Sequence, residues 1–416
     1  MSGPFGAIAL LVTRSLRQHL VSTLITVGAT GLAAGLVMAV FAIQRQSEAA
    51  FTGGGAEFDA VLGARGSQLQ LVLNSVFHLE TSPGNLPWSL FETIRTRPGV
   101  KRAIPYALGD NYYGYRVIGT TPARFEDERA PRIAQGRLFD PARREAVVGS
   151  FVAQQTGLRV GSTFTPYHGL TFDAAAAHVE DVYVVVGVAA PTNSPDDRVL
   201  WIPIEGIFRM SGHALRGAGE QYVAQPGELI PPEHREVSAV LLKFSSHQMG
   251  ARLEQEINKQ GKVATLAWPI ALQMAELFRK VGWMSDVLKV VAYLVVVVAA
   301  GAILASMYNT INERRRDFAI LRALGARKRV VFGAIVCEAA AIGALGALVG
   351  FVVFAAILAA AGELIRQQTG VVLQLAFEPA LWITPLAMVG LGALAGVLPA
   401  YKAYATDVAA HLAPQS

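Results

Sequence analysis

Four long stretches of the chain contain almost no Asp, Glu, Lys or Arg, and each is long enough to cross a membrane. The stretches are residues 20–43, 290–308, 330–362 and 379–401, and Glu338 is the one such residue within them. A bilayer core about 30 Å thick is crossed by about 20 apolar helical residues. The pattern therefore predicts four transmembrane helices.

Residues 1–19 carry apolar side chains at helical spacing, with Arg14 and Arg17 on the other side. This pattern predicts an amphipathic helix at the inner membrane surface or, equally, a plain extension of the first span. The first stretch is longer than the apolar core of a secretory signal, which has about 7–15 residues. We therefore expect an uncleaved anchor.

Lys and Arg concentrate on the cytoplasmic side of membrane proteins. Residues 309–329 are rich in them, with Arg314, Arg315, Arg316, Arg322, Arg327, Lys328 and Arg329. We therefore expect residues 1–19, 309–329 and the tail 402–416 to be cytoplasmic, with both termini inside. Residues 44–289 then form a large extracytoplasmic domain, and residues 363–378 form a short outer loop.

The large outer segment shows a mixture of strand and helix patterns. Runs rich in Val, Ile and Tyr predict strands at residues 116–119, 146–149, 182–189 and 237–244. Helical patterns occupy residues 86–96, 151–156, 248–259 and 268–286, and the last of these continues towards the second span. Residues 212–236 have little periodicity and predict a surface excursion. The expected fold class is four transmembrane α-helices plus a large α/β extracytoplasmic domain.

Composition supports a membrane protein and excludes several other classes. Apolar residues make up 52% of the chain and charged residues only 16%, whereas soluble chains carry about 25% charged residues. The net charge of +5 is explained by the predicted cytoplasmic segments, so we expect no nucleic-acid binding. Cys337 is the single cysteine, which excludes an intrachain disulfide framework and a cysteine-based metal site.

Residues 309–329 predict a short amphipathic helix between the second and third spans. Ile311, Phe318, Leu321 and Leu324 lie on or near one apolar face, and Gly325 is placed to end the helix. The basic cluster that follows suits phospholipid head groups.

This segment resembles the FtsX/MacB-type permeases of ABC transporters, a four-span class that transmits mechanical motion. The matching residues are Asn309, Glu313, Arg314, Arg315, Asp317, Ile320, Leu321, Arg322, Ala323, Leu324, Gly325 and Ala326, with Asp317 where Glu is usual. Glu338 is similar to the family's membrane-embedded acid, and residues 396–412 are similar to its closing motif. Residues 58–77 resemble the start of the MacB-type outer core domain, so the resemblance implies a MacB periplasmic-core fold.

The resemblance implies that a separate ATPase docks on the cytoplasmic helix. Its docking residues would be Glu313, Arg314, Arg315, Phe318, Leu321, Arg322, Leu324 and Gly325. We expect no MacB-type nucleotide-binding domain before the first span, and the one Gly-Lys pair, Gly261-Lys262, lacks the rest of a P-loop. We expect a non-enzymatic permease that binds no cofactor itself, with ATP and Mg²⁺ held by the ATPase.

The implied complex contains two permeases and two ATPases in the inner membrane. In it, ATP-driven motion reaches the periplasmic domains, which export or release a periplasmic or membrane-extracted substrate, with a periplasmic adaptor or substrate protein as a further partner. An alternative is a signalling subunit that controls a periplasmic enzyme such as a cell-wall hydrolase, although such relatives usually have a smaller outer domain. A third alternative is a receptor subunit that senses an outside ligand.

Three weaker signals remain open. Gly31 with Gly35, and Gly346 with Gly350, have the spacing that permits close helix packing. Glu338 predicts a polar contact to a neighbouring helix or to the partner permease. Outside the membrane, the histidines His168, His178 and His213 lie near Asp173, Glu180 and Asp181. Because no H-x-x-x-H pairing fixes two ligands on one element, we expect surface histidines and no metal site.

Overall fold

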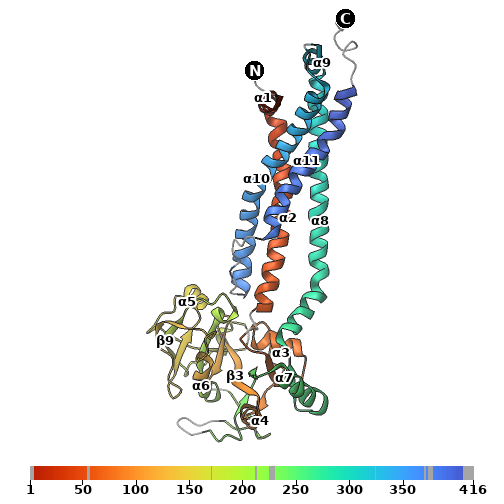
Figure 1. Ribbon diagram of the computed structural model, residues 1–416. Helices are drawn as coiled ribbons and strands as arrows, with labels where there is room; N and C mark the ends of the chain where they lie inside the picture. Colours follow the sequence, from red (N-terminus) through yellow and green to blue (C-terminus); the bar gives the residue numbers. More distant parts are fainter. Residues whose placement is uncertain are drawn as a thin grey trace. The chain divides into compact units, whose positions relative to one another are not determined.

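A computed structural model describes residues 4–53, 57–169, 171–210, 213–223, 230–323, 325–369, 372 and 378–405 of the protein (Figure 1). The chain divides into two units. The helical unit comprises Met1–Ser47, Val281–Leu364 and Leu373–Ser416. The sheet unit comprises Glu48–Lys280 and Ile365–Val372.

The helical unit contains the predicted spans. Its helices are α1 (Pro4–Gln18), α2 (Leu20–Gly53), α8 (Ile270–Glu313), α9 (Arg315–Ala323), α10 (Lys328–Thr369) and α11 (Pro379–Ala405), of which the end of α2, the start of α8 and the end of α10 belong to the sheet unit. Among the described residues, α2, α8, α10 and α11 are the four helices long and apolar enough to cross a membrane. The prediction of four spanning helices is therefore confirmed.

The helix α8 extends well beyond its predicted span. It has 44 residues, which at about 1.5 Å each give a length along the helix of about 66 Å, roughly twice the thickness of a bilayer core. The helical pattern expected from residue 268 onward is present, and it runs without a break into the apolar stretch. Trp268-Pro269 immediately precedes the helix.

The segment 309–329 is divided rather than forming one helix. Its first residues extend α8 to Glu313, α9 forms a separate short helix, and α10 begins at Lys328. Gly325 has a φ of +94°, a left-handed conformation that ends helices and favours glycine. The Gly325 and Ala326 N–H groups donate to the carbonyls of Arg322 and Leu321 at 3.1 and 3.0 Å, so the turn closes the end of α9.

Close packing of α2 against α10 depends on the four glycines that the spacing singled out. A Cβ added at Gly31 would lie 2.6 Å from Val349, and one at Gly35 would lie 2.6 Å from Val353. On the facing helix, a Cβ at Gly346 would lie 2.5 Å from Thr30, and one at Gly350 would lie 2.7 Å from Ala34. The backbones of the two helices therefore approach more closely than any residue with a side chain allows.

We expect Gly35→Leu to lower the unfolding temperature of the detergent-solubilised protein by several degrees, because the new side chain forces α2 away from α10. Gly28→Leu is the matched control on the same helix, since a Cβ at Gly28 meets nothing within 4 Å. Thermal unfolding of the two variants and the wild type makes the comparison. Equal unfolding temperatures for both variants would show that the close approach does not matter.

The sheet unit is built on one mixed sheet. In the described residues its main path has the order β13-β1-β12-β3-β4-β10-β6-β9-β5, with β7 paired to β9 and β8 paired to β3. The bounds are β1 (Ala60–Ala64), β3 (Val100–Tyr112), β4 (Tyr115–Thr120), β5 (Ile133–Gly136), β6 (Glu145–Val148), β7 (Thr163–Phe164), β8 (Tyr167–His168), β9 (Tyr183–Ala189), β10 (Val199–Pro203), β12 (Ala239–Phe244) and β13 (Ala264–Ala267). A separate pair is formed by β2 (Leu86–Pro87) and β11 (Glu236–Val237).

Two apolar cores form from alternate residues of the strands. On β10, Leu200 and Ile202 belong to one core and Trp201 belongs to the other, as expected where successive side chains point to opposite faces. The helices of this unit are α3 (Gln68–Ser75), α4 (Trp88–Arg95), α5 (Ser150–Thr156), α6 (Ile204–Phe208) and α7 (His247–Glu254). Mixed α/β structure is therefore confirmed.

Three predicted elements differ in detail from the observed ones. The predicted helix 86–96 begins only at Trp88, because Leu86 and Pro87 pair with β11 as a strand. The predicted strand 237–244 is divided at Ser238, whose backbone N–H donates to the carbonyl of Tyr106. The predicted helix 248–259 changes to a wider helical turn at Gln255–Gln260. Part of the predicted excursion 212–236 lies outside the described residues.

A buried ionic cluster ties the start of the sheet unit to its loops. The Arg124 side chain is 2% exposed and donates to Tyr106 Oη at 2.8 Å, Glu57 Oε1 at 2.8 Å and Asp196 Oδ2 at 2.7 Å. Burial raises the pKa of Asp196, but the nearby Arg124 guanidinium outweighs this effect and holds the pKa below its usual value. Burial raises the pKa of Glu57, and the nearby Arg124 and Arg102 only partly oppose this effect. Arg124 and Asp196 therefore form a buried ion pair.

We expect Arg124→Met to destabilise the sheet unit by about 3–5 kcal/mol, because it leaves two carboxylates without their buried partner. Arg143→Met is the matched control: Arg143 pairs with Asp140 while 70% exposed, and an exposed pair contributes about 0–1 kcal/mol. Urea unfolding of the full-length protein, followed by tryptophan fluorescence, measures both. Similar midpoints for the two variants would contradict the importance of the buried cluster.

Candidate functional site

The two faces of α9 have different environments. Phe318 is only 8% exposed and is buried in a cluster with Ile311, Val331 and Ile335, and Ala319 beside it is also buried. The other face presents Arg316, Asp317, Ile320 and Ala323. Ile320 is 41% exposed. The short helix is therefore fixed to the bundle on one side and free to meet another protein on the other.

A polar network holds α1, α9 and α10 together. Ser15 Oγ on α1 donates to Glu338 Oε1 on α10 at 2.5 Å. Arg314 Nη1 donates to Ser15 Oγ at 2.6 Å and lies 3.8 Å from Glu338 Oε2. The guanidinium of Arg314 also lies over the Phe318 ring, 5.1 Å from its centroid. The Glu338 residue is 6% exposed and the Arg314 side chain is 11% exposed, so a buried acid and a largely buried base meet at the start of α9.

The position of α1 follows from this network. Besides the Ser15 contact, His19 Nδ1 lies 3.4 Å from Glu313 Oε2 at the end of α8. The N-terminal helix (Pro4–Gln18) is separate from α2, which begins at Leu20. Glu338, for which the sequence left open a contact to another helix or to a partner permease, contacts α1 within the same chain.

The residues expected to dock an ATPase do not share one environment. The Glu313 side chain is 65% exposed, Arg314 is largely buried in the network above, and Arg315 donates a hydrogen bond to Asn312 Oδ1 at 2.8 Å. Leu321 and Arg322 are partly buried. Gly325 lies in the turn after α9, and Leu324 lies outside the described residues. Phe318, which was expected to be an apolar anchor for the ATPase, packs inside the helical unit and is 8% exposed, so its docking role stays a prediction.

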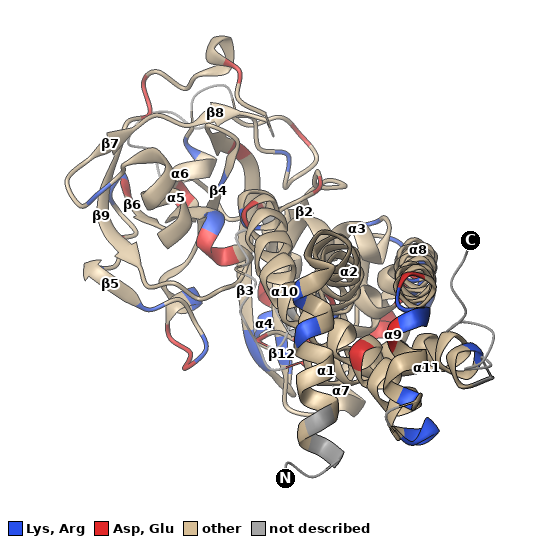
Figure 2. Ribbon diagram, turned by 90° about the horizontal axis from the view of Figure 1, so that it is seen from above, with Lys and Arg blue, Asp and Glu red and all other residues tan. Residues whose placement is uncertain are grey.

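Charge gathers at the end of the helical unit that carries α9. The helices α1 and α9 and the end of α11 lie at the same end of this unit (Figure 1). Seen from that end, Lys and Arg positions lie on α9 and on the neighbouring helix ends (Figure 2). Exposed basic residues here include Arg316, Arg327, Lys328 and Arg329.

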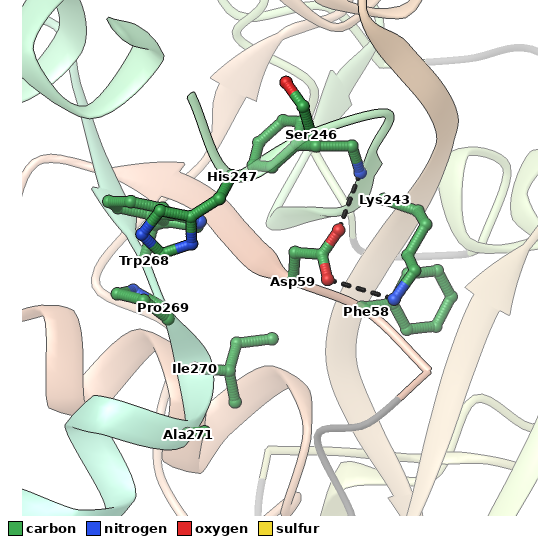
Figure 3. Close-up of a pocket in the computed structure, with 10 residues that line it drawn as sticks. Phe58, Asp59, Lys243, Ser246, His247, Trp268, Pro269, Ile270 and Ala271 are labelled. Carbon is green, nitrogen blue, oxygen red and sulfur yellow. Dashed lines mark hydrogen bonds and ion pairs between the residues drawn. The ribbon is translucent and has the colours of Figure 1, made fainter. Parts of the chain in front are cut away.

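A cleft of about 470 Å³ lies in the sheet unit at the start of α8 (Figure 3). Asp59 accepts hydrogen bonds from Lys243 Nζ at 2.9 Å and from the Phe244 backbone N–H at 2.7 Å. On the other wall, His247 and Trp268 lie together with ring centroids 4.6 Å apart. The Ile270 N–H donates to the Asp59 carbonyl at 3.1 Å, so the first turn of α8 is bonded to the segment that leads into β1.

Family comparisons assign both parts of the chain. The family model of the MacB-like periplasmic core domain matches residues 23–259, and that of the FtsX-like permease C-terminal matches residues 289–408. The first match alone covers more than half of the chain. The chain belongs to the FtsX/MacB-like permeases of ABC transporters. Its four apolar helices and MacB-like periplasmic domain make this permease an integral membrane protein.

Other comparisons add little to this assignment. The crystal structure of the periplasmic region of MacB from Actinobacillus actinomycetemcomitans is similar with a TM-score of 0.33 and 11% identity, covering 52% of this chain and 91% of that chain. Among curated proteins, no relative matches the chain. Membership of the permease family implies an ABC ATPase partner and dimerisation.

The three periplasmic histidines are not scattered on the surface as expected. They converge on Asp110, which the sequence analysis missed, and His178 is buried together with this acid. Burial raises the pKa of Asp110, but hydrogen bonds from His168, His178 and His213 outweigh it and hold the pKa well below the usual range. The hydrogen bond to Asp110 raises the pKa of His168.

Sequence reasoning also missed two residues of the exposed α9 face. Asp317 and Ile320 matched the family pattern but were not chosen as docking residues. The signal was available, since Arg316, Ile320 and Ala323 follow helical spacing. The apolar character of Phe318 favoured the opposite face, and only packing against α10 shows which face is covered.

Proposed function

We propose that this permease couples ATP hydrolysis by a separate ATPase to motion of its periplasmic domain, and that this motion drives export or release of a periplasmic or membrane-extracted substrate. The observation that carries the proposal is the two-sided environment of α9. Its exposed face, with Ile320 between Asp317 and Ala323, offers an apolar contact with a charged rim. Its covered face packs against the rest of the helical unit, so a displacement of α9 moves the other helices with it.

The path of the motion begins at α9 and follows the chain. Phe318 and Arg314 join α9 to the bundle, so a push on α9 moves the end of α8 at Glu313. As one uninterrupted helix, α8 passes the displacement along its length to Ile270. The hydrogen bond from Ile270 to Asp59 then transmits it to the strand β1.

The proposed orientation places α9 and both termini in the cytoplasm, because the basic residues gather at that end. Cys337 is exposed, and it is the single cysteine of the sequence, so a Cys337→Ser background allows single labels. We expect Arg316→Cys in that background to react with a membrane-impermeant maleimide only after the inner membrane is opened. Val263→Cys, which replaces an exposed residue of the sheet unit, should react before. The reverse pattern would contradict the orientation.

The proposed assembly contains two permeases and two ATPases, with ATP and Mg²⁺ bound by the ATPases. Only 17% of the most apolar window of α8 is buried within the chain. This helix therefore presents apolar surface to lipid and to a second copy. The size of the sheet unit favours transport over control of a cell-wall hydrolase.

Co-purification tests the proposal directly. The tagged permease is isolated in detergent, and bound proteins and small molecules are identified by mass spectrometry. We expect an ABC ATPase in equal amount to the wild-type permease, and its loss from the Ile320→Asp variant. A permease that retains no ATPase, or an Ile320→Asp variant that retains as much as the wild type, would contradict the proposed docking face.

A further inference from the structure

Four metal-binding side chains meet at one point of the sheet unit. Asp110, His168, His178 and His213 each offer one ligand atom, and these atoms all lie within 4.8 Å of one another. The four residues come from separate segments of the chain. None of them takes part in the proposed transmission of motion.

The distances between the ligand atoms fit a small tetrahedral ion. His168 Nδ1, His178 Nε2 and His213 Nε2 lie 3.3, 3.2 and 3.3 Å from Asp110 Oδ1, and His168 Nδ1 lies 3.2 Å from His213 Nε2. In a tetrahedral zinc site with metal–ligand distances of about 2.0–2.1 Å, neighbouring ligand atoms are about 3.3–3.4 Å apart. Four of the six edges of the tetrahedron therefore nearly match those of a zinc site, and the two edges from His178 to the other histidines are no longer than 4.8 Å.

Hydrogen bonding alone explains this arrangement poorly. Three imidazole nitrogens crowd around one oxygen of Asp110, while Oδ2 is buried without a hydrogen-bond partner among the described residues. A carboxylate that only accepts hydrogen bonds gains more from sharing three donors between its two oxygens. In addition, His168 and His213 direct nitrogens at each other, where two N–H groups would repel.

The ring orientations agree with ligands that share one centre. The three imidazole planes are inclined to each other by 84°, 76° and 81°, with centroids 5.1–5.8 Å apart. The rings therefore do not stack. Their lone pairs, which lie in the ring planes, can point to a common position between them.

The backbone holds the cluster in place from several sides. Asp110 follows a register irregularity between Leu108 and Asp110 in the pairing of β3 with β4, and it pairs with His168 on β8. Such bulges often redirect a side chain next to a functional site. The Asn111 amide donates to the carbonyls of Tyr167, Gly169 and Thr171 at 3.2, 3.0 and 3.1 Å. This anchors the segment that carries His168.

We propose that the sheet unit binds one Zn²⁺ ion through Asp110 Oδ1, His168 Nδ1, His178 Nε2 and His213 Nε2. Neutral imidazole and carboxylate are the nitrogen and oxygen ligands that zinc prefers. Four protein ligands fill the tetrahedron, so the site holds the ion and leaves no position for an activated water. The His168 side chain is 61% exposed and the Asp110 side chain is fully buried, so the ion enters past His168.

The test uses the full-length permease in detergent, purified with a tag that contains no histidine and stripped with a chelator. Zn²⁺ is added in competition with a chromophoric chelator of known affinity. We expect one Zn²⁺ per chain, and an affinity lowered by at least about 100-fold in His168→Gln, because loss of a direct ligand exceeds the about 10–100-fold cost of outer-shell changes. His178→Gln and His213→Gln should behave alike. His247→Gln, an exposed histidine of the same unit, is the matched control and should bind as the wild type does.

The visible spectrum of Co²⁺ bound to the wild-type protein is a second readout of the coordination geometry, and it needs no variant. Co²⁺ in place of zinc absorbs visible light strongly in tetrahedral coordination and weakly in octahedral coordination, so we expect the strong spectrum. His168→Gln removes the most exposed ligand and leaves the buried residues intact, so it keeps the test valid if the other variants fold poorly. Absence of stoichiometric zinc, equal affinity in His168→Gln and wild type, or a weak octahedral cobalt spectrum would each overturn the proposal.

Discussion

Replacing Ile320 by Asp is expected to abolish stimulation of the partner ATPase while leaving the permease folded in the membrane. Ile320 is exposed at the centre of the free face of α9. A carboxylate at this position would be buried against the ATPase without a partner. Loss of a central contact in an interface costs at least about 2 kcal/mol, which is about 30-fold in the dissociation constant.

The measurement is the ATPase rate of the reconstituted complex, together with the affinity of the ATPase for permease in nanodiscs. Ile320→Leu keeps the apolar contact and should retain most of the activity. Leu364→Asp places the same charge at an exposed apolar residue of α10, far along the chain from α9, and should leave docking unchanged. If Ile320→Asp bound the ATPase as tightly as the wild type, the free face of α9 would not be the docking surface.

Arg314→Leu is expected to destabilise the helical unit by about 3–5 kcal/mol, because it leaves Glu338 buried without a cation. The same change also removes the hydrogen bond to Ser15 and the contact with the Phe318 ring. We therefore expect α9 to loosen and the ATPase rate to fall together with the unfolding temperature. Arg316→Leu, on the exposed face, should leave the unfolding temperature unchanged.

A double-mutant cycle separates the ion pair from general packing. Glu338→Leu alone leaves Arg314 unpaired, whereas Arg314→Leu with Glu338→Leu removes both charges. We expect the double variant to recover more than half of the stability lost by Arg314→Leu, since replacing both members of a buried pair costs less than removing one. Strictly additive losses would show that the two residues do not interact.

The sequence was sufficient to predict the four spans, because a long run of residues without charged side chains is enough to identify a transmembrane helix. A run such as residues 290–308 has no charge to keep it in water, and its length fits the bilayer. The strand predicted at residues 182–189 is also present, as β9 at Tyr183–Ala189. The division of residues 309–329 into separate helices was harder to predict. The break between α8 and α9 lies at Arg314, whose side chain contacts Ser15 and Glu338 on other helices.

The proposed docking face and the histidine cluster could not be predicted from the sequence without the fold. Phe318 and Ile320 are both apolar residues of one short helix, and only the packing of Val331 and Ile335 decides which is covered. Asp110 and His213 are about a hundred residues apart, so no local spacing could pair them. The register of β3 with β8, which places Asp110 beside His168, is a property of the sheet alone.

The central claim is that the ATPase moves the periplasmic domain through this chain, and one measurement tests it most directly. A spin label at Val263→Cys in the Cys337→Ser background reports the distance between the sheet units of the two permeases. With the ATPase bound, ATP is expected to shift this distance distribution in the wild type and leave it unchanged in the Ile320→Asp variant. A distribution that ATP does not alter in the wild-type complex, or one that ATP alters without the ATPase, would contradict the account.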